Sequence, residues 1–397
     1  MQQIARRIFN RNIKKTLQSS IKKPSEVIGL YQQTKENAKQ RFFNADTLVQ
    51  AEKTPFEVVH QKDIVTLRYY PPLECDSIQV EDGQGGEFTV EVAKKSLPTP
   101  LVLVSPLAVN MYIYDLFPKR SLVKYLRARG FELYLVDWGR PGWRQNHFSI
   151  ETYIADLMPE MMAKVREHSG KQTLSLHGWS FGGMFSAAYS ALDKDIKNVA
   201  LIGAPCDYHA NGELGVQYQR ISRNLRWLEK RTGWRVHNTK QRWWRSPGWA
   251  NSMAFKLTNP VGSIQGYLDL LKNLHDEEYI ISHATNGAFL DDMVAYPGAV
   301  IQDVIQFLWT DNIMAKGELP LRNLRVNYSD VRANLCLITG KHDPIVTTDC
   351  GLKLFDHASS EDTFHQEVKG GHMGILSGSK STTEIWPQVA DWLIERS

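Results

Sequence analysis

The sequence has little that would mark a metal, disulfide or membrane protein. Its four cysteines, among 397 residues, include no C-x-x-C pair, so we predict neither a zinc site nor a disulfide framework. No stretch approaches the ~20 apolar residues of a membrane-spanning helix, and the net charge of +4 is too small to indicate a polyanionic partner by itself. Scattered, reduced thiols favour a cytoplasmic protein, and we predict no metal and no other cofactor.

The composition and the N-terminal stretch give the first positive evidence. With 42% hydrophobic and 23% charged residues, the chain is expected to bury a core, as one large α/β domain with an insertion or as two domains. Its first residues are rich in arginine and lysine, and no acid precedes Glu26. We predict a basic helical leader over residues 1–54, which either packs on its own domain or lies on an anionic membrane or inclusion surface. The apolar face of this leader comprises Ile4, Ile8, Phe9, Ile13 and Leu17.

Short apolar runs separated by helical stretches indicate a mostly parallel sheet. Runs of this kind are typical of strands that are buried on both sides, so we predict an α/β fold with helices on both faces of the sheet. Two-residue alternation at 64–70 and a short run at 88–92 suggest early strands. The main strands are expected at 101–104, 133–136, 174–176, 199–202, 335–338 and 364–368.

The interval between the strands at 199–202 and 335–338 is too long for one crossover helix. It contains helical patterns of its own, such as those at 267–274 and 299–308. We therefore predict a core formed by residues 55–206 and 331–397. Residues 207–330 are expected to form an inserted, mostly helical cap over the carboxyl ends of the strands, where open α/β sheets bind ligands.

The most informative motif is Gly-Trp-Ser-Phe-Gly, at residues 178–182. An apolar strand precedes it and a helical stretch follows, which is the context of a G-x-S-x-G nucleophile elbow. In that turn the serine hydroxyl stands at the apex, exposed to substrate, and the small glycines let strand and helix pass close to each other. We predict that Ser180 is a nucleophile. The alternative is a Ser/Gly-rich helix start without chemistry.

Two residues near the C-terminus complete a catalytic arrangement. A serine hydroxyl needs a base, and the base needs an orienting acid; in enzymes with this elbow the acid and then the histidine follow the serine. Asp343 comes just after the strand at 335–338, and His372 lies in a glycine-rich loop after the strand at 364–368. We predict Ser180, Asp343 and His372 as the catalytic residues, with an ordinary turn position as the alternative for the last two.

The transition state of acyl transfer also needs two N–H donors for its oxyanion. One donor is expected from Phe181, the residue after the nucleophile, and the other from the loop after the strand at 101–104. Val109 is the candidate for the second donor, with Ala108 and Asn110 as alternatives.

A basic, tryptophan-rich stretch lies within the predicted cap. Between Arg220 and Trp249 the chain carries nine arginines and lysines, five tryptophans and one acid, Glu229. Such side chains bind the phosphates and adenine of a CoA ester, an anionic membrane or inclusion surface, or single-stranded nucleic acid; alternatively, the tryptophans pack the cap. No nucleic-acid-binding module surrounds the stretch, so nucleic acid is not expected. The tentative substrate-binding residues are Arg223, Arg226 and Trp227.

From about Pro55 to its end, the chain resembles the polyhydroxyalkanoate synthases, especially the short form that works with a partner subunit. This resemblance implies an α/β-hydrolase fold with a cap. It also implies acyl transfer from 3-hydroxyacyl-CoA onto a growing polyester through a covalent acyl-enzyme. Ser180, Asp343 and His372 stand in the places of nucleophile, acid and base. The matching stretches are 100–106, 115–124, 135–141, 178–182, 204–207, 246–249 and 370–375.

Two departures from that family bear on the reaction. The family has cysteine where this chain has Ser180, and its acid is usually followed by histidine, whereas Pro344 follows Asp343. A thiolate accepts acyl groups readily from thioesters, while a serine ester suits slower transfer or hydrolysis. The expected function is therefore synthase-like acyl transfer, with an esterase, thioesterase or depolymerase as the alternative. A non-catalytic protein that coats an inclusion or membrane surface is a third possibility. For the partners of the chain, we expect a second subunit or a homodimer.

Overall fold

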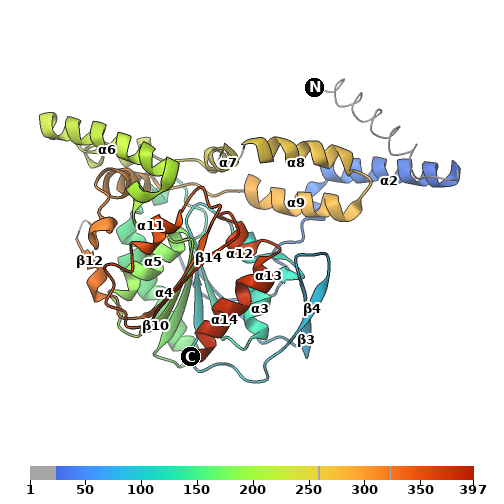
Figure 1. Ribbon diagram of the computed structural model, residues 1–397, viewed down its shortest axis with the longest axis horizontal. Coiled ribbons are helices and arrows are strands. Elements are labelled where there is room, and N and C mark those ends of the chain that lie inside the picture. Colours follow the sequence, from blue (N-terminus) through green and yellow to red (C-terminus); the bar gives the residue numbers. More distant parts are fainter. Residues whose placement is uncertain (1–23, 258–259, 322) are drawn as a thin grey trace. The chain divides into compact units, whose positions relative to one another are not determined.

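The computed structural model describes residues 24–257, 260–321 and 323–397, and its central element is an eight-stranded sheet (Figure 1). Six neighbouring strands, from β8 to β14, run parallel, while β1 and β2 are antiparallel at one edge. The predicted, mostly parallel sheet is therefore confirmed. In spatial order the strands are β1 (Glu57–Lys62), β2 (Val65–Tyr70), β8 (Leu133–Asp137), β5 (Leu101–Val104), β9 (Leu174–Trp179), β10 (Ile196–Ile202), β13 (Asn334–Gly340) and β14 (Thr363–Val368).

The apolar runs of the sequence form the centre of this sheet. All four residues of β5 are fully buried, because helices cover both faces, as predicted. Helices α4 (Met158–Ser169) and α5 (Phe181–Ser190) lie on one side of the sheet, and α3 (Leu122–Ala128) and α14 (Trp386–Glu395) lie on the other (Figure 1).

The sequence missed several short elements at the periphery. The run at 88–92 forms β4 (Glu87–Glu91), but this strand pairs with β3 (Ser77–Glu81) in a separate two-stranded sheet. The other small elements are β6 (Asp115–Phe117), β7 (Arg120–Ser121), β11 (Glu318–Pro320), β12 (Arg325–Asn327), α11 (Thr348–Leu352), α12 (Gly374–Ser377) and α13 (Ser381–Glu384).

The chain forms two compact units. The larger comprises residues 52–251 and 293–397 and contains the whole sheet. Its helical insertion includes α6 (Gly212–Thr232), α10 (Gly298–Asp303) and the π-helical turn η8 (Val304–Thr310). Helix α7 (Gly248–Leu257) belongs in part to each unit.

The smaller unit comprises residues 1–51 and 252–292. Its described helices are α2 (Pro24–Phe43), α8 (Pro260–Lys272) and α9 (Glu277–Asp291). It has its own small core, and Asn37 Nδ2 donates to the carbonyl oxygen of Leu274 at 2.9 Å. Part of the predicted leader thus shares a unit with part of the predicted cap. The apolar stripe predicted for the leader lies outside the described residues, and the proposed domain boundaries stay a prediction.

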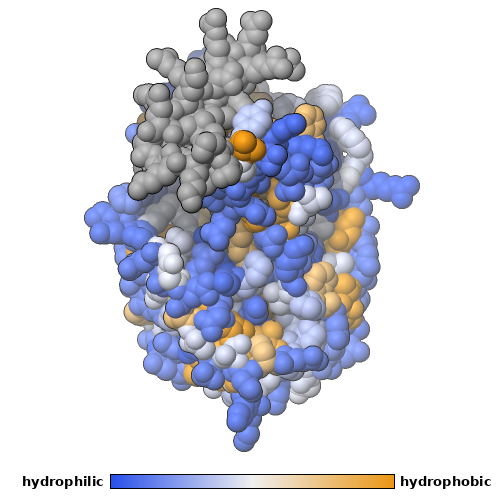
Figure 2. All heavy atoms as spheres, turned by 90° about the vertical axis from the view of Figure 1, so that its right-hand side faces the viewer, coloured by the Kyte–Doolittle hydropathy of each residue, from blue (hydrophilic) through white to orange (hydrophobic). Residues whose placement is uncertain are grey.

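Among the helices that the structure describes, none has the length and apolar character needed to cross a membrane. The face drawn in Figure 2 carries hydrophobic residues as small groups between hydrophilic ones.

The central strand β9 carries a buried histidine, three residues before Ser180. The His177 side chain is only 3% exposed, and its Nδ1 has no hydrogen-bond partner in the described part of the chain. Burial lowers the pKa of His177 from 6.5 to about 4, because the apolar interior disfavours the charged imidazolium.

This histidine predicts a specific loss of stability in mild acid. Between pH 6.5 and 4 the unfolded chain binds a proton at His177 that the folded chain does not bind, so folding weakens as the pH falls through this window. At 1.36 kcal/mol per pKa unit, the loss between pH 7 and pH 5 is about 2 kcal/mol. Urea unfolding at both pH values should show this loss, and His177→Leu should reduce the pH dependence by the same amount. Equal pH dependence in both proteins would contradict the assignment.

Candidate functional site

Ser180 stands alone between β9, which ends at Trp179, and α5, which begins at Phe181. Its backbone has φ 55° and ψ −123°, a left-handed conformation that is strained for any residue except glycine. The backbone N–H of Ser180 donates to the carbonyl oxygen of Ile202 at 2.9 Å, and its own carbonyl oxygen accepts from Gly183 N–H at 3.0 Å. These bonds hold a partly exposed side chain at the carboxyl end of the strand. The turn has the geometry of the predicted elbow.

Three glycines allow this turn to form. A Cβ at Gly178 would collide with backbone atoms of Gly182 and Gly183, so strand and helix meet without room for a side chain. A Cβ at Gly182 would overlap the carbonyl oxygen of Val104, at the end of β5. A Cβ at Gly183 would lie 2.5 Å from the Cβ of Ala204. The glycines thus bring the loops after β5, β9 and β10 together.

Asp343 and His372 form a buried pair beside this turn. His372 Nδ1 lies 2.7 Å from Asp343 Oδ2, and the side chains are 5% and 0% exposed. The other oxygen, Oδ1, accepts the N–H groups of Ile345 at 2.8 Å and Val346 at 2.9 Å. Because these backbone donors fix the carboxylate, it can hold the imidazole in one orientation. The two residues come together from the ends of β13 and β14, as the sequence predicts.

His372 lies against the elbow itself. Its carbonyl oxygen accepts Trp179 Nε1–H at 3.1 Å, and the two rings are 5.2 Å apart. A Cβ placed on Gly203 would lie 3.4 Å from Cε1 and Nδ1 of the imidazole. Gly203 directly follows Ile202, the residue that accepts the Ser180 N–H. Ser180 and His372 therefore contact the same short segment after β10.

The loop after β5 lies on the other side of Ser180 from the loop after β10. Ala108 has φ 64°, and its carbonyl oxygen accepts the N–H of Val294 at 2.9 Å. The side chain of Asn110 accepts the N–H of Tyr112 at 3.2 Å. Since Gly182 abuts the start of this loop, Phe181 and Val109 belong to adjoining segments. Their role as oxyanion donors stays a prediction.

The tentative substrate-binding residues lie on α6. Arg223, Arg226 and Trp227 are exposed, and Arg226 Nη2 donates to the carbonyl oxygen of Asp311 at 3.2 Å. The side chain of Trp227 is 56% exposed and contacts the guanidinium of Arg231. None of the three is among the residues that line a cleft of about 960 Å³, which is formed instead by residues 143, 144, 146, 147, 235, 237–242, 302 and 307.

The half of this cleft that follows β8 is not evident from the sequence. Trp143, Arg144 and His147 precede Arg235 by about ninety residues, and only the fold brings them together. The sequence does contain a local indication of this cleft, since Trp143 and Arg144 are an aromatic and a basic residue side by side, as in the basic stretch at 220–249.

Comparison with known proteins places the chain in a family. The sequence matches the alpha/beta hydrolase fold family over residues 100–379. A poly(3-hydroxyalkanoate) polymerase subunit of Haloferax mediterranei is 27% identical over 87% of this chain and 65% of its own length. A second such subunit, from Allochromatium vinosum, is 26% identical over 77% of this chain and 83% of its own length. The chain thus spans just under two thirds of the haloarchaeal relative.

Solved structures show a looser likeness. A soluble variant of monoglyceride lipase from Saccharomyces cerevisiae is 13% identical and has a TM-score of 0.48, covering 88% of this chain and 96% of that chain. This score is too low to add to the assignment. The polymerase subunits confirm the resemblance to the polyhydroxyalkanoate synthases. Together with the family match they also confirm the expected enzyme class, an acyltransferase or hydrolase. Because the match at residues 100–379 covers most of the sequence, the chain belongs to the alpha/beta hydrolase fold family.

Proposed function

We propose that this chain transfers a 3-hydroxyacyl group from a CoA thioester to the hydroxyl end of a polyester, through an acyl-enzyme on Ser180. The observation that carries this proposal is the buried pair of Asp343 and His372, 2.7 Å apart, against an elbow that presents a serine. The similarity to proteins named poly(3-hydroxyalkanoate) polymerase subunits supports the substrate class.

In the first half of the reaction Ser180 takes the acyl group. His372 Nδ1 is bonded to Asp343, so Nε2 is the ring nitrogen that accepts the proton of the Ser180 hydroxyl. Ser180 Oγ attacks the thioester carbonyl, and the oxyanion receives hydrogen bonds from Phe181 N–H and a donor at 108–110. The intermediate collapses, the C–S bond breaks, and His372 returns its proton to the leaving sulfur. The products are the free thiol and an ester on Ser180.

The second half repeats these steps with an alcohol as the nucleophile. His372 takes the proton of the acceptor hydroxyl, the acceptor oxygen attacks the ester on Ser180, and the Ser180 oxygen leaves with the proton from His372. The polyester is then longer by one unit and the serine is free. Asp343 stabilises the imidazolium that forms in each half.

Hydrolysis is the second candidate, and the identity of residue 180 favours it. If water replaces the acceptor hydroxyl, the same residues carry out an esterase, thioesterase or depolymerase reaction. A serine ester is less activated than the thioester that a cysteine would form. Water therefore competes more effectively with a polymer end than it would in a cysteine enzyme.

We propose that the protein acts in the cytoplasm, at the surface of polyester inclusions, with a partner subunit or a second copy of the chain. Three of its four cysteines are buried and all four are free, which fits a reducing compartment. A purely structural coat protein, the remaining alternative, would have no need for a strained serine beside a buried His–Asp pair.

Covalent labelling tests the nucleophile. A fluorophosphonate probe should modify Ser180 in the folded protein, as mapped by peptide mass spectrometry, and Ser180→Ala should remain unlabelled. Asp343→Asn should slow turnover of a 3-hydroxybutyryl thioester by about three to four orders of magnitude, because the histidine is no longer held in the required tautomer. Asp349→Asn, an exposed carboxylate six residues away, is the matched control and should retain activity. Absence of labelling at Ser180 would refute an enzymatic role.

The fate of the acyl group tests synthase against hydrolase. Purified protein supplied with 3-hydroxybutyryl-CoA should release CoA and form polyester. Ser180→Cys should form more polymer per CoA released, because its thioester intermediate is more reactive toward the acceptor. Free hydroxyacid without polymer, from both proteins, would rule out the synthase and establish the hydrolase.

A further inference from the structure

The cleft of about 960 Å³ lies wholly within the larger unit. One wall is the turn η3 (Arg144–His147), which follows β8, and the other wall is the segment 235–242, which includes the short turn η6 (Val236–Asn238). Helix α10 and the turn η8 form its floor through Gln302 and Phe307. The volume is at the upper end of the ~300–1,000 Å³ range of small-molecule sites.

The lining of this cleft is strongly basic. It contains Arg144, Arg235, Lys240 and Arg242, two histidines, and no aspartate or glutamate. Arg235 is neutralised, since Nη2 pairs with Asp311 at 2.7 Å and Nη1 with Glu229 at 3.3 Å. The other three cations are exposed, and within the described residues they form no ion pair. A concave surface with several unneutralised cations attracts a ligand that carries more than one negative charge.

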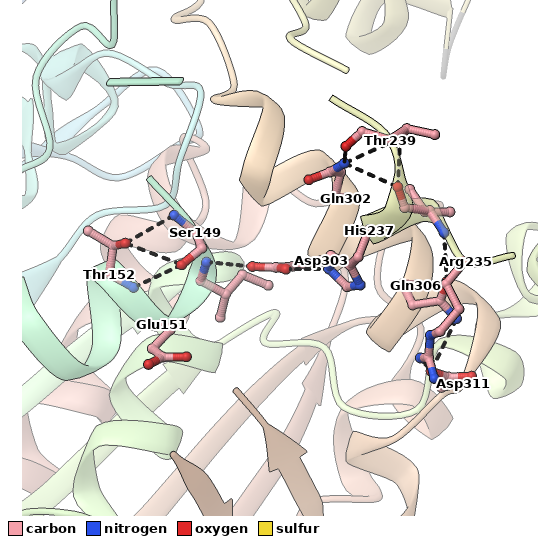
Figure 3. A network of polar contacts seen from close by, with 12 residues as sticks. Ser149, Glu151, Thr152, Arg235, His237, Thr239, Gln302, Asp303, Gln306 and Asp311 are labelled. Carbon is pink, nitrogen blue, oxygen red and sulfur yellow. Dashed lines mark hydrogen bonds and ion pairs between the residues drawn. The ribbon is translucent and has the colours of Figure 1, made fainter. Parts of the chain in front are cut away.

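A buried polar network fixes the basic wall in place (Figure 3). Asp303 is 2% exposed; its Oδ2 accepts the N–H of Ile150 at 2.9 Å, and its Oδ1 lies 2.8 Å from His237 Nε2. Gln302 Nε2 donates to the carbonyl oxygens of Val236 at 3.1 Å and Thr239 at 2.8 Å. The segment that carries Lys240 and Arg242 is therefore preorganised, which reduces the entropic cost of binding.

An exposed aromatic ring stands at the edge of the cleft. The indole of Trp143 is 69% exposed, and the guanidinium of Arg245 lies 5.1 Å from its centre. Arg245 Nη2 is itself held by the carbonyl oxygen of Pro141 at 2.6 Å. A large, exposed indole next to phosphate-binding cations offers a stacking surface for a planar base.

The basic wall continues toward the nucleophile. Ser246, four residues beyond Arg242, pairs with Tyr296 through two backbone hydrogen bonds of 3.3 and 2.9 Å. The ring of Tyr296 packs on Phe181, with 6.4 Å between ring centres. Phe181 directly follows Ser180. The pairing of Ser246 with Tyr296 thus connects the segment that carries Arg242 to the residue that follows Ser180.

We propose that this cleft binds the phosphorylated nucleotide end of an extended ligand. Arg144, Lys240 and Arg242 contact the phosphates, and the indole of Trp143 stacks on the base. The proposal rests on the proposed function to the extent that the other end of the ligand delivers its acyl group to Ser180. A free nucleotide carries the same phosphates and base. Such a ligand would regulate the enzyme and would not be its acyl donor.

Calorimetric titration of the full chain with adenosine 3′,5′-bisphosphate tests the site without catalysis. The unaltered protein should bind this probe. Arg144→Gln/Arg242→Gln should bind it at least about tenfold more weakly, since two charge-assisted contacts to the phosphates are lost. The matched control Arg220→Gln/Lys230→Gln removes two exposed cations of α6, outside the cleft, and should bind as the unaltered protein does. Equal weakening by both pairs would mean unspecific attraction and would overturn the proposal.

Two further titrations separate the parts of the ligand. Trp143→Ala should weaken binding of the bisphosphate but leave inorganic pyrophosphate unaffected, because only the nucleotide has a base to stack. Preference for adenosine 3′,5′-bisphosphate and CoA over ATP assigns the site to the acyl donor, and equal binding of ATP assigns it to a free nucleotide. No binding of any nucleotide overturns the proposal.

Ser180→Ala keeps the two proposals distinguishable. This variant should bind the bisphosphate as tightly as the unaltered protein, because the hydroxyl takes no part in the cleft. Failure of nucleotide binding with normal labelling of Ser180 would remove only the cleft assignment. Normal nucleotide binding without labelling would instead remove the proposed acyl transfer.

Discussion

The close crossing of β9 and α5 is the constraint on which the site depends. Backbone atoms of the two elements approach so closely that Gly178 has no room for a Cβ, and Gly182 has none because it lies against the end of β5. The chain can make this turn only if the residue at its apex adopts a left-handed conformation, and Ser180 does so at φ 55°. Such strain costs on the order of 1–3 kcal/mol, and the burial of the surrounding strands offsets it. The side chain at this apex stays partly exposed.

The same crossing also determines what surrounds the nucleophile. Gly182 rests on the end of β5, and Gly183 rests on Ala204, so the loops after three neighbouring strands converge at one point. His372 enters from a fourth loop and packs on Gly203, while Asp343 holds it from a fifth. Each contributes from the carboxyl end of a parallel strand, where an open α/β sheet places its ligands. These residues therefore lie close together because of the order of the strands in the sheet and not because they are close in the sequence.

The sequence was most informative where local chemistry alone sets the structure. The run at 101–104 is β5 without a shift, because a continuous apolar run can only be a buried strand here. Asp343 stands out in the sequence because it follows the apolar run at 335–338, and His372 because it lies in a glycine-rich loop near the C-terminus. Strand β1 was missed, since its exposed and partly buried residues carry no clear alternation. The cleft proposed to bind a nucleotide was missed for another reason. Arg144 and Arg242 are distant in the sequence, and only the fold places both in its lining. The density of basic residues alone favoured Arg223, on α6, as a substrate-binding residue, but Arg223 does not line this cleft.

Because residue 180 is a serine, we infer that the residues around it determine which acceptor takes the acyl group. Transfer from a thioester to a cysteine keeps the acyl group activated, so the acceptor reacts readily. In the proposed reaction, transfer to Ser180 gives up that activation, and the next step exchanges one ester for another with little driving force. In this mechanism His372 activates water and the polymer hydroxyl alike, because Asp343 holds its ring in the same orientation for both acceptors. Selection for the polymer end must then come from walls that exclude water, such as Tyr296 packed on Phe181. Under the proposed acyl transfer, hydrolysis competes in the interval between departure of the thiol and arrival of the acceptor.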